Sequence, residues 1–319
     1  MTRRLVWLLA FALLVGGALA FWRSWKPSPA AAPGSTIRVA ETVPEIAAAA
    51  SGRSRVLFVG LDGADWQLLD RYVEAGAMPN LKALVAAGRS GAPRTIQPPL
   101  SPLVWTTMMT GVSPLEHRVL DFTRFHPASG AREPITSDER RVPAVWTLAS
   151  AAGRKVGVFG LWATYPAERV NGLVVSDRLF SFQEAGDEGA APPAGIVSPP
   201  GREGWAREAL AAAERETGCA EVRAYAEGLD AAECARLVAA PDPFANPVAA
   251  LRRILVETRV YHALAADWIA AEAPDLAIVY FQGTDAVGHV FAPYAPPRMS
   301  TQSEADFARY GRVPERYFR

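Results

Sequence analysis

RVLFVGLDG, residues Arg55–Gly63, is the stretch that decides the predicted fold. Its apolar residues form an almost uninterrupted run that ends on Asp-Gly. A run of this length and composition is typical of a β-strand that is buried on both faces, as in a parallel sheet. We therefore predict a buried strand with Asp62 at its carboxyl end.

The segments that follow alternate between helical and strand patterns. Asp65 is the predicted N-cap of a helix, and a second helix ends on Gly88. Alternation of strands with helices favours a three-layer α/β/α sandwich with a mostly parallel sheet, covered on both faces. The predicted helices are WQLLDRYVEAG (66–76), MPNLKALVAAG (78–88), VPAVWTLASAAG (142–153), 203–216 and 246–273, and the later strands lie in KVGVFGLW (155–162), GLVVSD (172–177) and LAIVYFQGTD (276–285).

The region 182–245 interrupts this alternation. Its first part, 181–200, is rich in Gly, Pro, Ala and acidic residues and is predicted as a loop. We predict that 182–245 is a cap or an insertion in a domain that spans 54–319.

The N-terminus carries an export signal or an anchor. Arg3 and Arg4 precede 18 uncharged residues, LVWLLAFALLVGGALAFW (5–22), which could just cross a bilayer at about 1.5 Å per residue. ALA at 18–20 resembles a cleavage site, whereas Arg23 and Lys26 suit a retained anchor. Residues 1–22 are therefore a signal peptide or a transmembrane anchor, and 23–53 are a Pro/Ala-rich linker. Either alternative predicts a body in the periplasm, held at the inner membrane if the segment is retained.

Composition restricts the classes of partner and ligand. The 33 basic residues equal the 33 acidic ones, so the chain has no net positive charge that would indicate nucleic-acid binding. Only four histidines are present, which limits any metal site. Cys219 and Cys234 suit one disulfide in an exported protein and two buried thiols equally well.

Three polar positions follow apolar runs and are expected to converge, because ligands of open α/β sheets bind at the carboxyl ends of the strands. The first is Ser101, in PPLSPLVWTTMMTG (98–111). Ser-Pro followed by an apolar run predicts a helix start with an ordinary capping serine. A hydroxyl at a helix N-terminus can also attack a phosphate that the backbone amides bind.

The other two positions carry metal-ligand chemistry. Asp62 suits a metal ligand and an ordinary Asp-Gly turn about equally. An aspartate nucleophile is a weaker alternative, because Asp62 and Asp65 are one residue too far apart for the usual Asp-x-Asp. Asp285 and His289 lie four residues apart, which places both on one helix face as candidate zinc or manganese ligands. The alternative is a helix-start Asp and an interior His.

Together these motifs resemble one family. VLFVGLDG, MPNLKALVAAG, PPLSPLVWTTMMTGVSPLEHRVLDF and VYFQGTDAVGHVF occur in the order found in the type I phosphodiesterase and nucleotide pyrophosphatase branch of the alkaline phosphatase superfamily. Within this branch, the chain resembles bacterial proteins described as predicted phosphohydrolases or phosphomutases. The resemblance implies an alkaline-phosphatase-type sandwich and two divalent ions, Zn²⁺ or Mn²⁺. It also implies that Ser101 is the nucleophile and a ligand with Asp62 of one ion, and that Asp285 and His289 bind the other.

The chain departs from the family pattern at two places. Val104 stands where nucleotide pyrophosphatases carry Asn, which argues against nucleotide diesters as substrates. The family's downstream Asp-His-Gly motif and further His are not found before Arg319, so three expected ligands are missing and the C-terminal part of the domain is expected to be incomplete.

The expected activity is metal-dependent hydrolysis of a small-molecule or lipid-linked phosphate ester through a covalent phosphoserine. The alternatives are a catalytically silent or truncated binding protein and a phosphoryl-group transferase or phosphomutase.

Overall fold

The computed structural model describes residues 54–126, 128–180, 192–240 and 246–319. The predicted leader (1–22) and linker (23–53) lie outside the described residues, as do parts of the predicted cap or insertion. In the part of the chain that the structure describes, no helix is both long enough and apolar enough to cross a membrane.

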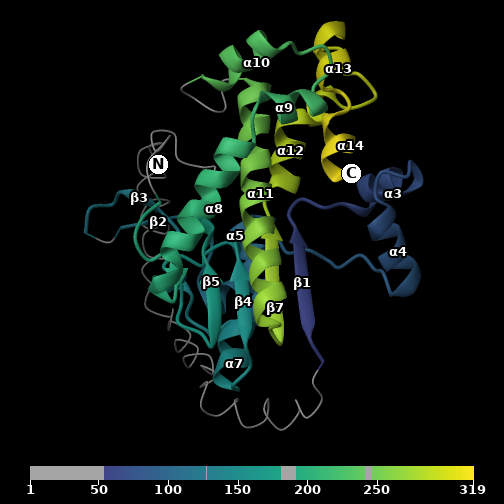
Figure 1. Ribbon diagram of the computed structural model, residues 1–319. Coiled ribbons are helices and arrows are strands. Elements are labelled where there is room, and N and C mark those ends of the chain that lie inside the picture. Colours follow the sequence, from purple (N-terminus) through teal and green to yellow (C-terminus); the bar gives the residue numbers. More distant parts are fainter. Residues whose placement is uncertain (1–53, 127, 181–191, 241–245) are drawn as a thin grey trace, which may run out of the picture. The chain divides into compact units, whose positions relative to one another are not determined.

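A five-stranded sheet organises the body, in the order β1-β7-β4-β5-β6 (Figure 1). β1 pairs with β7, β7 with β4 and β4 with β5, all in parallel, and only β6 runs antiparallel to its neighbour β5. The fold is therefore α/β with a mostly parallel sheet, as the sequence predicts. The strands are β1 (Val56–Leu61), β4 (Val156–Phe159), β5 (Gly172–Val175), β6 (Val197–Ser198) and β7 (Leu276–Phe281).

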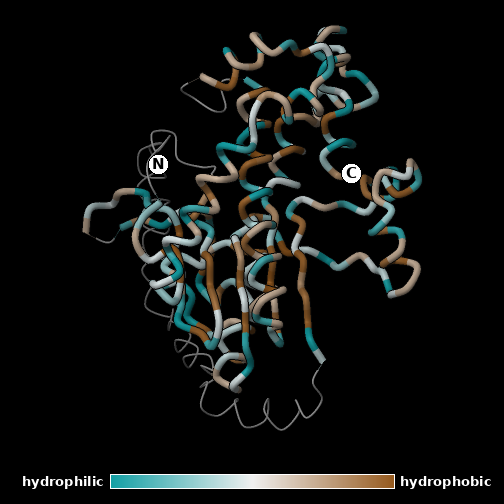
Figure 2. Tube along the Cα trace, viewed as in Figure 1, coloured by the Kyte–Doolittle hydropathy of each residue, from teal (hydrophilic) through white to brown (hydrophobic). Residues whose placement is uncertain are grey.

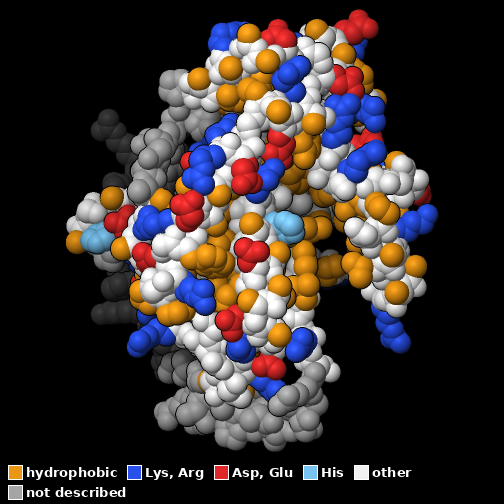
Figure 3. All heavy atoms as spheres, in the orientation of Figure 1, with side chains coloured by type: hydrophobic (Ala, Val, Ile, Leu, Met, Phe, Trp, Pro, Cys, Tyr) orange, Lys and Arg blue, Asp and Glu red, His pale blue; other side chains and the backbone are white. Residues whose placement is uncertain are grey.

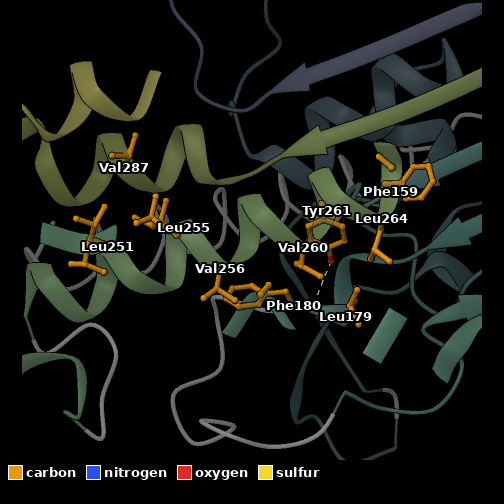
Figure 4. Packing of buried hydrophobic residues seen from close by; sticks show 14 of the residues in the cluster. Phe159, Leu179, Phe180, Leu251, Leu255, Val256, Val260, Tyr261, Leu264 and Val287 are labelled. Carbon is orange, nitrogen blue, oxygen red and sulfur yellow. Dashed lines mark hydrogen bonds between the residues drawn. The ribbon is translucent and has the colours of Figure 1, made fainter. Parts of the chain in front are cut away.

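One face of the sheet is covered by α11 (Pro247–Glu272) and α8 (Glu203–Glu216). Leu173 and Val175 of β5 belong to the hydrophobic cluster on this face. Figure 4 shows Val260 and Leu264 of α11 in the same cluster. Asn246 caps α11 by accepting from the Ala249 amide at 2.9 Å, so the predicted helix 246–273 begins where its cap indicates.

The opposite face is covered by α5 (Ser101–Thr110) and α7 (Val145–Ala151). Val174 points to this side, where it shares a cluster with Trp105 of α5 and Trp146 of α7. Neighbouring residues of β5 thus enter different clusters, because successive side chains of a strand point to opposite faces. Helices on both faces give the three layers predicted from the alternating pattern.

β1 differs from the prediction of a strand buried on both faces. It is an edge strand of the described sheet, and Leu57 and Val59 are 59% and 51% exposed. Figures 2 and 3 show hydrophobic residues along β1 and at the surface over it. The prediction was wrong because an apolar run reports the preference of a strand for burial, whereas neighbouring elements determine whether it is covered.

Of the two helices after β1, the second also exposes apolar side chains. Asp65 caps α3 (Trp66–Glu74) by accepting from the Gln67 amide at 2.9 Å, as predicted. α4 (Pro79–Ala87) has no buried residue, and Leu84 is 70% exposed.

The described part of the predicted cap or insertion packs against the main sheet. β6 lies in 192–240 and pairs with β5, and α8 packs against α11. Cys219 and Cys234 form a disulfide with Cα atoms 5.9 Å apart, which decides between the two alternatives left open by the sequence. The disulfide joins α9 (Cys219–Tyr225) to α10 (Ala231–Val238).

The remaining elements complete the described body. A two-stranded antiparallel ribbon pairs β2 with β3. The remaining α-helices and strands are α6 (Pro114–His117), β2 (Thr123–Phe125), β3 (Arg132–Pro134), α12 (Gly283–Phe291), α13 (Glu304–Tyr310) and α14 (Val313–Phe318).

Candidate active site

Asp62 lies at the carboxyl end of β1 and next to the start of α12. The Asp62 amide donates to the Phe281 carbonyl at 3.1 Å, which extends the pairing of β1 with β7 by one residue. The Thr284 hydroxyl of α12 donates to the Asp62 carbonyl at 2.6 Å. Parallel pairing therefore brings together two segments that are more than 200 residues apart in the sequence.

Ser101 is not the N-cap that the Ser-Pro pattern predicts. α5 begins at Ser101 itself, and its N-cap is Leu100, whose side chain caps nothing. The Ser101 hydroxyl instead donates to Asp62 Oδ2 at 2.9 Å. The prediction of an ordinary capping serine was wrong because Asp62, which is distant in sequence, offers a charged acceptor.

Three further donors bind the Asp62 carboxylate. Trp105 Nε1 donates to Oδ1 at 2.9 Å, and the Tyr280 hydroxyl donates to Oδ2 at 2.6 Å. The Gly63 amide donates to Oδ1 at 3.2 Å, so each carboxylate oxygen accepts two hydrogen bonds. A buried carboxylate requires such partners, and these four fix the orientation of Asp62.

Trp105 and Tyr280 are site residues that the sequence reasoning missed. Trp105 lies four residues after Ser101, so the helical repeat places both on one face of α5. Tyr280 is the penultimate residue of β7 and is fully buried. Burial, together with the negative charge of Asp62, raises the pKa of the Tyr280 hydroxyl well above its usual value, so this hydroxyl stays protonated and donates.

Asp285 and His289 share one face of α12, as their spacing predicts. His289 Nε2 lies 3.3 Å from Asp285 Oδ2. Burial and the nearby Asp62 carboxylate raise the pKa of Asp285, and His289 opposes this rise. The His289 side chain is 79% exposed, which excludes the alternative of an interior histidine.

Asp285 also lies directly against Gly63, the residue that follows Asp62. A Cβ atom on Gly63 would stand 2.7 Å from Asp285 Oδ1, and the Gly63 φ angle of +62° is in the left-handed region. Glycine at this position thus permits both the Asp-Gly turn and the close approach of Asp285. The structure places the four predicted site residues in two pairs, Asp62 with Ser101 and Asp285 with His289, and Asp285 lies against the residue that follows Asp62.

The side chains of these residues are of types that can bind a divalent metal ion. Carboxylate oxygens, a hydroxyl and an imidazole are ligands that Zn²⁺ and Mn²⁺ accept. They occur as two pairs, Asp62 with Ser101 and Asp285 with His289. Among the described residues, no three His, Cys, Asp or Glu side chains converge where an ion could bind. Each pair would need additional ligands.

His117 has a structural role at the end of α6. It is fully buried, and its Nδ1 accepts from the Val119 amide at 3.1 Å. Its Nε2 therefore carries the proton and donates to the Thr107 hydroxyl at 2.8 Å. Burial and the charge of Arg140 lower the pKa of His117 to about 4. A neutral, fully paired imidazole in this position is not available as a metal ligand.

Comparisons with known proteins identify the family. The model of the family "Type I phosphodiesterase / nucleotide pyrophosphatase" matches residues 56–310, which is well over half of the chain. No curated protein matches the chain significantly. The chain therefore belongs to the type I phosphodiesterase/nucleotide pyrophosphatase family, which comprises hydrolases of phosphoric esters.

Two solved structures show distant similarity, and both are phosphonoacetate hydrolase from Sinorhizobium meliloti 1021. The complex with phosphonoformate is 17% identical, with a TM-score of 0.43, and the match covers 83% of this chain and 52% of that one. The complex with phosphonoacetate is 19% identical, with a TM-score of 0.36, and the match covers 72% and 46%. The chain spans about half the length of these proteins.

Proposed function

We propose that this family member is a metal-dependent phosphoric ester hydrolase that acts through a covalent phosphoserine at Ser101. The observation that carries the proposal is the 2.9 Å hydrogen bond from the Ser101 hydroxyl to Asp62 Oδ2. A serine at the first position of a ten-residue helix would ordinarily satisfy the helix backbone or face water. Here its hydroxyl is instead held against a buried carboxylate.

The start of α5 offers a site for the phosphoryl group. Amides in the first turn of a helix have no partner within the helix, and the helix dipole favours an anion there. Ser101 lies at this end, so a phosphate bound by these amides would be close to its Oγ atom. Asp62 accepts the hydroxyl proton and leaves an oxygen lone pair free for attack on phosphorus.

Two bond exchanges complete the proposed reaction. The Ser101 Oγ–P bond forms while the bond from phosphorus to the leaving alkoxide breaks, and the alkoxide takes up the proton that Ser101 gave to Asp62. Water then attacks phosphorus, the Oγ–P bond breaks, and Ser101 regains its proton as phosphate leaves. Bound divalent ions would lower the pKa of the Ser101 hydroxyl and offset the charge that develops on the phosphoryl oxygens. Asp62 and Ser101 would hold one ion, and Asp285 and His289 the other.

Two observations bear on substrate and location. Val104 occupies the position of the family's Asn, so we propose a small-molecule or lipid-linked phosphate ester in preference to a nucleotide diester. The disulfide between Cys219 and Cys234 suits an oxidising compartment, which supports export to the periplasm through the N-terminal segment.

A catalytically silent binding protein is a second candidate. The absence of any three-ligand group among the described residues favours it, because catalytic zinc sites normally have three protein ligands. A phosphoryl-group transferase would share the phosphoserine step and differ only in the acceptor.

Ser101→Ala tests the nucleophile, with Ser113→Ala as a matched control. Ser113 caps α6 in a capping box with Glu116, so it is an ordinary capping serine in the same region. We expect S101A to reduce hydrolysis of p-nitrophenyl phosphate and its diester, with zinc present, by at least about 10³-fold. S113A should retain activity and lose about 1 kcal/mol of stability.

Mass spectrometry of acid-quenched protein should find phosphoserine at Ser101. Zinc-stimulated hydrolysis that persists in S101A would exclude Ser101 as the nucleophile. No hydrolysis by the wild-type chain at any zinc concentration would favour the silent protein.

A further inference from the structure

Glu257 is a buried carboxyl group to which the proposed reaction gives no role. It lies on α11, is 2% exposed, and faces the point where β7 passes into α12. The Gln282 amide donates to Glu257 Oε1 at 3.3 Å, and the Gly283 amide also donates to this carboxyl. These amides belong to the N-terminus of α12, where backbone donors have no partner inside the helix.

A second layer of polar contacts holds Glu257 in place. The Thr258 hydroxyl donates to Glu257 Oε2 at 3.3 Å and lies 2.7 Å from the Tyr317 hydroxyl of α14. These groups close tightly over Gly283. A Cβ atom there would stand 2.4 Å from the Tyr317 hydroxyl and 3.0 Å from Glu257 Oε2.

The first turn of α12, which Glu257 binds, also contacts the candidate site. Thr284 ties the first turn of α12 to the Asp62 carbonyl, and Asp285 follows directly. Farther along α12, Val287 packs in the same cluster as Leu251 and Leu255 of α11 (Figure 4). Apolar packing holds the body of α12 on α11, whereas Glu257 holds its first turn.

We infer that Glu257 is a positioning residue: it binds the first amides of α12 and thereby sets where Asp285 and His289 stand relative to Asp62 and Ser101. The claim that Asp285 and His289 are placed to bind a metal rests on the proposed function. The claim that Glu257 anchors the first turn of α12 does not depend on it. Burial raises the pKa of Glu257 to about 8, which agrees with a carboxyl enclosed by protein.

Glu257→Ala is the main test, and it is read out in two ways. Hydrogen exchange of the α12 amides reports whether the helix is anchored, with or without metal. Competition for zinc with a chromogenic chelator measures the zinc affinity, which depends on how the ligand pairs are placed. We expect E257A to speed exchange in α12 by at least about tenfold and to weaken zinc binding 10–100-fold, as is usual for residues that orient metal ligands.

Two variants separate this role from a general loss of packing. Glu257→Gln keeps an oxygen that can accept from Gln282, so it should restore most of the protection of α12 and most of the zinc affinity. Tyr261→Phe is the matched control, since Tyr261 lies one turn along α11, is buried, and donates to the Ser176 carbonyl at 2.9 Å, away from α12. Y261F should change neither measurement.

The outcomes distinguish the two proposals. If wild-type protein binds no zinc but E257A still loosens α12 alone, the metal-dependent function is wrong and the anchoring role stands. If α12 exchange is unchanged in E257A, or rises equally in Y261F, Glu257 is not a positioning residue. If E257A does not fold, Tyr317→Phe serves instead, because it removes the contact between the Tyr317 and Thr258 hydroxyls. Y317F should then raise the exchange of the α12 amides by less than is expected for E257A. No rise in Y317F would overturn the inference.

Discussion

The covered flank of the sheet (β7, β4 and β5) and its open flank (β1) are built from similarly apolar strands but are covered very differently. β4 lies between β5 and β7, and all four of its residues are buried. β1 is just as apolar, yet Leu57 and Val59 are exposed at its edge, and α4 nearby buries nothing. Hydrophobicity alone does not bury a strand. It must also have neighbours in the sheet and a helix on each face.

The candidate site joins these two flanks. Asp62 stands at the end of the open strand β1, but the groups that orient it come from the covered flank: Tyr280 from β7 and Trp105 from α5. Glu257 of α11 adds the anchor of α12. A weakly covered strand can thus carry a fixed carboxylate, because side chains of the well-packed region hold that carboxylate by hydrogen bonds.

The buried carboxyl of Glu257, on the covered flank, should make the stability of the protein strongly dependent on pH. The folded pKa of Glu257 is about 8, above its ordinary value, so its contribution to stability is complete at low pH and is lost as pH rises through about 8. Glu257→Gln does not titrate. Between pH 5 and 9, the free energy of unfolding of wild type should therefore fall relative to that of E257Q by on the order of 4 kcal/mol.

Urea denaturation at several pH values measures this difference. Glu216→Gln is the control, since Glu216 is an exposed glutamate on α8 and its loss should leave the pH profile unchanged. Parallel profiles for E257Q and wild type would show that Glu257 is not a desolvated acid.

A smaller effect is expected in the apolar core of the covered flank. Leu264 of α11 is 1% exposed inside the main cluster. Leu264→Ala removes buried methyl groups and leaves a cavity, so it should cost about 3 kcal/mol of unfolding free energy. Thermal and urea denaturation check this value. A loss below about 1 kcal/mol would mean that the core near Leu264 relaxes freely.

The smallest effect is expected on the open flank. Leu57→Ala removes the same atoms as Leu264→Ala, but from a side chain that is already largely in water. Its effect on the free energy of unfolding should stay within about 0.5 kcal/mol. The same denaturation measurements apply, and a loss comparable to that of L264A would show that β1 is covered in solution.

Much of the fold was predictable because local sequence patterns, such as apolar runs and helix caps, indicate it. The apolar runs and their caps place β1, β4, β5, β7 and most of the long helices close to where the structure has them. The four-residue spacing of Asp285 and His289 placed both on one helix face. These features depend on backbone geometry and on near neighbours, which the sequence displays directly.

Contacts between distant segments were not predictable in the same way. Nothing in the local sequence pattern singled out Tyr280, Trp105 or Glu257, and Ser101 looked like a capping residue. Their roles arise because parallel pairing puts the ends of β1 and β7 side by side and α5 places its first residue beside Asp62.

The sequence by itself determined the alternation of strands and helices, the α/β class and the residue types of the candidate site, because these follow from hydrophobic periodicity and side-chain chemistry. The tertiary structure decided that Cys219 pairs with Cys234, that β1 lies at an edge, and that the Ser101 hydroxyl points to Asp62. Each of these depends on which surfaces meet after folding, since burial and hydrogen bonding over long sequence separations are properties of the assembled chain.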